Sequence, residues 1–284
     1  MSVILKRNMK LFFRDKIAFL MSLLAVTIII VLYVLFLGDV WGPGAMRALP
    51  GADILLYQWL MAGILAVTTI TTPFGALIVI VNDRVKKLSK GLYVSPLKRS
   101  HIASGYILGA FVASVISAII MAIIMTIFIA IRGGSLLTPI VYLQIFGVVL
   151  LSSLSGTAMM CFIVSFVKSH AVFTTISMLL ATLVGFLTGV YFLNNGVSEF
   201  TQRIIQFFPP THAAALLRQV IMDAQMQVTF SGLPNEAVDA FKALTWTVLY
   251  VGETEITPFM SVIVLLATSI TFYGLSLLSM RINK

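Results

Sequence analysis

The sequence predicts an all-α integral membrane protein with six transmembrane helices. Of its 284 residues, 60% are hydrophobic and only 10% are charged, whereas soluble domains contain about 25% charged residues. The apolar residues gather in six runs, each with the roughly 20 residues that a helix needs to cross the hydrocarbon core. No Asp or Lys falls at the centre of a run, as expected when a central charge costs about 2.5–3.5 kcal/mol on insertion.

The chain is interpreted as one transmembrane domain over residues 1–284. Residues 1–16 precede the first span, residues 82–105 connect spans two and three, and residues 194–257 separate the last two spans. None of these segments is as long as a typical soluble domain of about 100–150 residues, so no separate catalytic domain is expected. The six predicted spans cover residues 17–37, 54–81, 106–131, 138–167, 171–193 and 258–280.

The Lys and Arg residues indicate the orientation of the spans. Six spans place both termini on one side of the membrane. If that side is the cytoplasm, the inside segments hold 14 basic residues and two acids, a net charge of +12, and the outside segments hold five basic residues and eight acids, a net charge of −3. This distribution satisfies the positive-inside rule. The overall charge of +9 therefore indicates topology and contact with lipid headgroups, and nucleic acid is not an expected partner.

Residues 1–16 predict an amphipathic helix at the inner membrane interface. Ile4, Leu5, Phe12 and Phe13 stand among five basic residues. A helix of this composition lies with its apolar face in the lipid and its basic face on anionic headgroups.

The external segment 194–257 predicts short helices between spans five and six. Residues 199–208 and 212–223 are amphipathic at helical spacing, and two prolines separate them. Both are too short to span, so we expect them to lie at the outer interface or to re-enter the membrane. They are either interfacial helices without a transport role or a gate over an internal cavity. Residues 235–251 predict a further external helix. The residues of the predicted gate are Phe207, Phe208, Pro209 and Pro210.

Motifs of several enzyme classes are absent from the sequence. It contains no G-x-x-x-x-G-K-[ST], no H-E-x-x-H and no G-x-S-x-G. His101, His170 and His212 lie in three different predicted loops, and Cys161 is the only cysteine, so neither a metal site nor an internal disulfide is expected. The spans contain no acid or base of the kind that ion-coupled carriers use, although sodium sites built from backbone carbonyls escape this criterion.

Small residues recur at helical spacing at the start of the third predicted span, in the series Gly105, Gly109, Ala113 and Ser117. Such a series allows two helices to approach closely. Packing within the chain and dimerisation both remain open as explanations.

Three stretches occur in a characteristic order. The first is the amphipathic start KRNMKLFFRDKIAFLMSLL, the second is the connector GLYVSPLKRSHIASGYILGAF, and the third is the Pro-containing IIQFFPPTHAAALLRQVIMD. Together with the number of spans, this order resembles the ABC-2 type permease family, the membrane subunits of bacterial ABC exporters, and in particular its drug- and antibiotic-exporting members. The sequence departs from the family where a Glu-rich phrase often precedes the connector. Here the sequence is NDRVKKLSKG, with Asp83 as the only acid.

The resemblance implies that the loop 82–105 contains a coupling helix over about residues 86–94. In such transporters this helix docks in a groove of a separate ATP-binding subunit. The apolar pair Leu92 and Tyr93 is expected to seat the helix, and the flanking charges are expected to orient it. A basic loop with only a topological role remains the alternative. The residues assigned to the coupling loop are Lys86, Lys87, Leu88, Lys90, Gly91, Leu92, Tyr93, Val94 and Pro96.

The resemblance also implies partners and a location. The family works with twelve spans, which implies a second permease subunit, identical or similar, and two ATP-binding subunits that hold ATP and Mg²⁺. No cofactor is expected in this chain, and none of its residues is expected to be catalytic. The expected cargo is hydrophobic or amphipathic: a drug, a peptide antibiotic or a lipid-like molecule. The expected location is the bacterial cytoplasmic membrane. A stand-alone secondary carrier or channel, or a membrane enzyme acting on lipid, are the alternatives.

Overall fold

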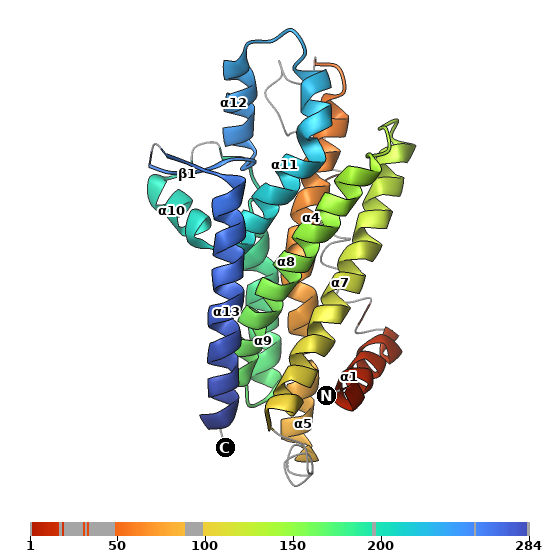
Figure 1. The fold of residues 1–284 in the computed structure, drawn as a ribbon, viewed down its shortest axis with the longest axis vertical. Coiled ribbons are helices and arrows are strands. Elements are labelled where there is room, and N and C mark those ends of the chain that lie inside the picture. The colour runs from red at the N-terminus through yellow and green to blue at the C-terminus, as the bar shows by residue number, and fades with distance from the viewer. Residues whose placement is uncertain are drawn as a thin grey trace.

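The computed structural model describes residues 2–16, 19, 31, 33, 49–88, 99–194, 197–252 and 254–282. Within these residues the chain forms a bundle of long helices with shorter helices at both ends (Figure 1). The elements are α1 Ser2–Arg14, α4 Ala52–Ala76, α5 Ile78–Val85, α7 Arg99–Ile131, α8 Pro139–Ser165, α9 His170–Leu187, α10 Glu199–Phe207, α11 Pro209–Thr229, α12 Asn235–Leu244, β1 Leu249–Val251, β2 Thr254–Ile256 and α13 Pro258–Ile282.

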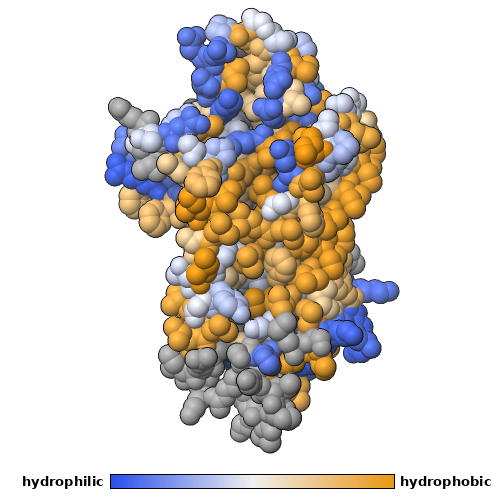
Figure 2. Space-filling view, viewed as in Figure 1, coloured by the Kyte–Doolittle hydropathy of each residue, from blue (hydrophilic) through white to orange (hydrophobic). Residues whose placement is uncertain are grey.

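Five helices in the described part of the chain are long and apolar enough to cross a membrane. They correspond to predicted spans two to six, and Figure 2 shows apolar surface over the middle of the face in view. A nearly all-α membrane protein is thereby confirmed. The first predicted span, 17–37, lies outside the described residues except for three positions and stays a prediction. The five helices are Ala52–Val85, His101–Ile131, Pro139–Ser165, His170–Leu187 and Pro258–Ser279.

The two ends of the bundle carry different elements. Helix α1 and the carboxyl end of α13 lie at one end, here called the α1 end (Figure 1). Helices α10 and α12 and the β1–β2 hairpin lie at the other, here called the α12 end, where the surface in Figure 2 is largely hydrophilic. Helix α4 is central and contacts α7, α8, α9 and α11. It is buried on all sides, and Leu55, Trp59 and Leu65 are each 0% exposed.

A proline shapes the inner part of the central helix. Because Pro73 has no N–H, the carbonyl of Thr69 loses its helical donor. The hydroxyl of Ser114 on α7 donates to this carbonyl at 3.5 Å. Helix α8 approaches it at Gly156, where an added Cβ would lie only 2.3 Å from the Thr69 oxygen. The helix then breaks at Leu77 and resumes as α5.

The external segment contributes one long buried helix. Helices α10 and α11 occupy the positions of the predicted helices 199–208 and 212–223, and α11 continues to Thr229. Pro209 and Pro210 form the first turn of α11, where a missing N–H costs no helical hydrogen bond. Helix α11 contacts α4, α8 and α13, so its Ala213–Leu217 stretch belongs to the core of the bundle.

The predicted helix over 235–251 is wrong in its second half. Helix α12 ends at Leu244, and Trp246 has a φ of +55°, which a right-handed helix does not accommodate. The chain then forms an antiparallel hairpin in which Tyr250 pairs with Glu255. Thr, Val and Tyr dominate these residues and favour strands over helices, and Gly252 adopts a φ of +64° between the strands.

Candidate functional site

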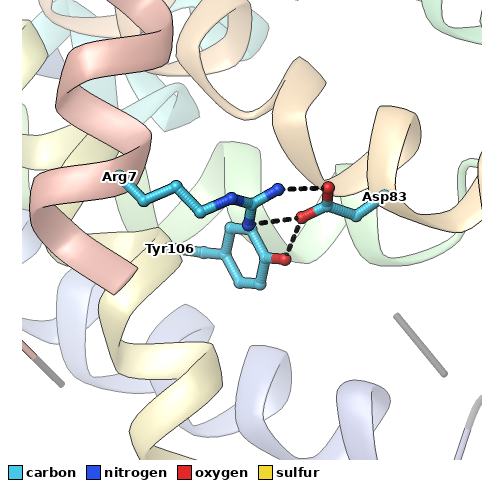
Figure 3. A network of polar contacts seen from close by, with 3 residues as sticks. All are labelled: Arg7, Asp83 and Tyr106. Carbon is cyan, nitrogen blue, oxygen red and sulfur yellow. Dashed lines mark hydrogen bonds and ion pairs between the residues drawn. The ribbon is translucent and has the colours of Figure 1, made fainter. Parts of the chain in front are cut away.

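A polar cluster occupies the α1 end at the place where the predicted coupling loop leaves and rejoins the bundle. Figure 3 shows its three side chains: Arg7 from α1, Asp83 from α5 and Tyr106 from α7. Helix α5 leads into the loop and α7 follows it. The cluster therefore joins both flanks of the loop to the amino-terminal helix.

One carboxylate holds the cluster together. Asp83 is 2% exposed. Arg7 donates from Nη1 to Oδ2 at 2.8 Å and from Nη2 to Oδ1 at 2.5 Å, which is the bidentate geometry of a strong arginine–carboxylate pair. The hydroxyl of Tyr106 donates to the same Oδ2. A single buried side chain thus fixes three helices relative to one another.

The charges of Arg7 and Asp83 depend on each other. Hydrogen bonding to Asp83 raises the pKa of the Arg7 guanidinium, so the arginine stays charged. A buried carboxylate that has lost its partner is strongly unfavourable, because neither water nor a counter-charge then compensates it. The Arg7 side chain keeps 33% of its surface exposed, so the pair lies at the border between the core and solvent.

A second arginine anchors the same helix to α8. Arg84 donates from Nη1 to the carbonyls of Val164 at 3.1 Å and Val167 at 2.7 Å. The last carbonyls of a helix lack internal donors, and a cation at that end is favoured by the helix dipole. Asp83 and Arg84, adjacent in the sequence, therefore tie α5 to α1 and to α8 respectively.

Helix α1 packs closely on α7. An added Cβ at Gly109 would lie 3.1 Å from the Cβ of Asn8, so the glycine permits this contact. Ile4, Asn8 and Phe12 follow one another at four-residue spacing and are all buried. The sequence assigned Ile4 and Phe12 to the lipid, but in the structure they lie on the face of α1 that packs on the bundle.

The coupling-loop residues predicted from the sequence lie beside this cluster only in part. Lys86 caps the carboxyl end of α5, and Lys87 follows with a φ of +57°. Leu88 is 51% exposed. The coupling role of the whole set stays a prediction, because its other members, Lys90, Gly91, Leu92, Tyr93, Val94 and Pro96, lie outside the described residues.

The predicted external gate lies at the opposite end of the bundle. Phe207 ends α10 and is 90% exposed, whereas Phe208 is partly buried between α10 and α11. Pro209 and Pro210 begin α11. These positions neither require nor exclude gating, so the gate stays a prediction.

A buried arginine joins four elements close to that end. Arg218 of α11 is 0% exposed and donates from Nη2 to the carbonyls of Thr188 at 2.9 Å and Gly189 at 3.0 Å. Its Nη1 donates to the Trp246 carbonyl at 3.3 Å, and the guanidinium lies 5.1 Å from the centroid of the Trp59 ring. No described acid pairs with it. The guanidinium instead caps the carboxyl end of α9.

The described residues hold no group of three His, Cys, Asp or Glu side chains that could bind a metal ion. Cys161 is buried in α8. His212 has partners on both ring nitrogens, the Ser261 hydroxyl at 3.1 Å and the Gln206 carbonyl at 2.9 Å. These side chains have packing and hydrogen-bonding roles.

Sequence reasoning missed the residues that build the cluster. It identified Asp83 as the only acid of the connector but did not predict its partner. The position of Asp83 as the only acid in a basic connector could have indicated an ion pair, because a single carboxylate among many bases is strongly attracted to one of them. Arg7 and Tyr106 carried no comparable signal, since one belongs to a run of bases and the other starts an apolar span.

Comparison with known proteins agrees with this architecture. Residues 45–278, most of the chain, match the family model described as ABC-2 family transporter protein. No curated protein matches the sequence. The chain therefore belongs to the ABC-2 transporter family and is a multi-pass membrane component of an ABC transporter.

Proposed function

We propose that the chain is the permease subunit of an ATP-driven exporter in the bacterial cytoplasmic membrane, with both termini in the cytoplasm. Two copies of a separate ATP-binding subunit supply the energy and hold ATP and Mg²⁺. A second permease subunit, identical or similar, completes the pathway. The cargo is hydrophobic or amphipathic: a drug, a peptide antibiotic or a lipid-like molecule.

The observation that carries this proposal is the shared carboxylate of Asp83. Asp83 belongs to α5, the helix before the predicted coupling loop. Its carboxylate binds Tyr106 of α7, the helix after the loop, and Arg7 of α1. A loop that served only to satisfy topology needs no such rigid base. A loop that transmits force does, because slack at its attachment would absorb the movement.

The connections beyond the cluster indicate where a displacement of the loop would travel. Arg84 links α5 to the end of α8. On the other side, α5 is separated from α4 by the turn at Leu77. Pro73, one turn earlier, removes a hydrogen bond from the ladder of α4, which makes this stretch a natural hinge. Closure of the ATP-binding subunits would thus move α1, α5 and the start of α7 as one unit against the central helix.

The decisive experiment places charge on the apolar part of the coupling loop. The variant Leu92→Asp/Tyr93→Asp should insert normally, because the loop lies outside the spans. It should nevertheless lose its stimulation of ATP hydrolysis when reconstituted with the ATP-binding subunit that co-purifies from the native host. Leu136→Asp is the matched control: Leu136 is 69% exposed in the turn between α7 and α8, away from the α1 end.

Two outcomes would contradict the proposal. If no P-loop ATPase co-purifies in mild detergent, the chain has no energy-supplying partner. If transport persists in vesicles that contain this chain alone, it acts as a secondary carrier or channel. Unchanged ATPase stimulation by the double Asp variant would instead refute only the assignment of Leu92 and Tyr93.

A further inference from the structure

A large cavity opens at the α1 end, between α1, α4, α5 and α9. Its volume is about 840 Å³, within the range of pockets that take organic ligands of drug size. The cavity lies at the level where Leu77 separates α4 from α5, and small residues stand along its wall. Gly75 on α4 and Ser177 and Ala181 on α9 leave space that larger side chains would fill.

The inner wall of the cavity is apolar. Phe74 of α4 and Phe173 of α9 stack with their ring centroids 4.5 Å apart and their planes 10° from parallel. Val79 of α5 and Leu180 of α9 extend this wall. A ligand body lying here contacts carbon surface, and each CH₂ group that moves into the cavity from water contributes about 0.8 kcal/mol.

The mouth of the cavity is charged, with a positive excess. Arg7, Arg14 and Lys86 line it together with Asp15 and Asp83. Asp83 pairs with Arg7, and the lining as a whole has one more base than acid. Arg14 and Lys86 are exposed and make no ion pair with a described residue.

From this arrangement we infer that the cavity binds an anionic amphipath, with its apolar body against Phe74 and Phe173 and its anionic head at Arg14 and Lys86. A neutral apolar ligand would gain no electrostatic attraction from the two cations. A cationic ligand would face their repulsion. The inference names the charge class of the ligand, which is either the cargo or a membrane lipid that occupies the same site. A role of this site in export rests on the proposed function.

The test measures binding to the purified permease alone, in bilayer discs of zwitterionic lipid. The probe is a long-chain fatty acid with a photoreactive diazirine on its tail, and the reference is the monoacylglycerol with the same tail. After illumination, mass spectrometry locates the label. The fatty acid should label the α4 and α9 segments around Phe74 and Phe173, and the neutral reference should label them several-fold less.

Two pairs of variants separate a built site from general adsorption. Arg14→Gln/Lys86→Gln should lower labelling roughly 25-fold, since each base near a membrane surface is worth about a fivefold change in affinity for an anion. Lys6→Gln/Lys10→Gln removes the same charge from exposed positions of α1 outside the cavity and should have little effect. Ser177→Trp should block the cavity, whereas Thr175→Trp, exposed on the same helix and outside the lining, should not.

The outcomes are distinct. Equal labelling by the neutral reference, or labelling that survives both Ser177→Trp and the Arg14/Lys86 double variant, would overturn the inference. If it holds, competition identifies the source. Displacement of the probe by phosphatidylglycerol at bilayer abundance assigns the site to a membrane lipid, and persistence of the probe assigns it to cargo. Neither result depends on an ATP-binding subunit, so a failure of the proposed energy coupling would leave this binding unchanged.

Discussion

Arg7 and Asp83, 76 residues apart in the sequence, share two hydrogen bonds that tie α1 to the end of α5. Because Tyr106 donates to the same carboxylate, α1 cannot move independently of the two helices that bracket the predicted coupling loop. The amino-terminal helix is therefore a structural part of the loop's base.

The Arg7–Asp83 pair predicts non-additive effects on stability. Arg7→Ala and Asp83→Ala should each lower the midpoint of thermal unfolding in detergent, because each leaves a charge without its partner. The double variant should lose less than the sum of the two, with a coupling of about 0.5–3 kcal/mol. Lys10→Ala, on an exposed position of α1, should change stability by less than about 0.5 kcal/mol. Strict additivity would show that the pair contributes no interaction of its own.

The five long apolar helices of the described residues could be predicted from sequence because their signal is local. A run of apolar residues and the placement of Lys and Arg both follow from the cost of charge in hydrocarbon. The hairpin could not, because Leu249–Val251 and Thr254–Ile256 are too short for a clear alternating pattern. The helix predicted over residues 235–251 therefore continued past Leu244 into the first strand.

The polar sites could not be predicted because they form between distant parts of the chain. Arg7 stands in a basic run that topology already explains, and nothing local links it to Asp83. Arg218 likewise had the appearance of an exposed external base, yet it is fully buried against the end of α9. Only the packing of α11 into the bundle brings that guanidinium to its carbonyl partners.

The contact between α4 and α8 predicts a strict requirement for glycine. Gly156→Ala should destabilise the protein by about 1–3 kcal/mol, as overpacking does, because its Cβ would lie 2.3 Å from the Thr69 carbonyl oxygen. Gly147→Ala is the matched control on the same helix, since nothing lies within 4 Å of its added Cβ. That substitution should be neutral or stabilise by about 0.5–1 kcal/mol through helix propensity. Equal thermal midpoints for the two variants would contradict the close approach of α4 and α8.

The buried guanidinium of Arg218 predicts that lysine cannot replace it. Arg218→Ala leaves carbonyls at the end of α9 without donors and should cost about 1–3 kcal/mol. Arg218→Lys should recover only part of this, because one ammonium cannot reproduce a planar fork that reaches Thr188, Gly189 and Trp246 together. Arg203→Ala on α10, where the side chain is 80% exposed, should stay within about 0.5 kcal/mol of the wild type. Thermal unfolding in detergent ranks the three variants, and full rescue by lysine would contradict the fork geometry.

His212 predicts a loss of stability in mildly acidic solution. Burial lowers its pKa below the ordinary value of 6.5, so the folded protein holds the neutral ring, with Nε2 donating to the Gln206 carbonyl and Nδ1 accepting from the Ser261 hydroxyl. A histidine with a lowered folded-state pKa contributes stability above the unfolded-state pKa, and that stability is lost as the pH falls through 6.5 toward the folded-state value. The thermal midpoint of the wild type should therefore fall between about pH 7.5 and about pH 5, and His212→Gln should flatten the change while starting from a lower midpoint. The other two histidines are present in both proteins, so their effect cancels in the comparison. Parallel pH curves for the wild type and His212→Gln would contradict the prediction, because they would show that His212 has the same pKa in the folded and unfolded states.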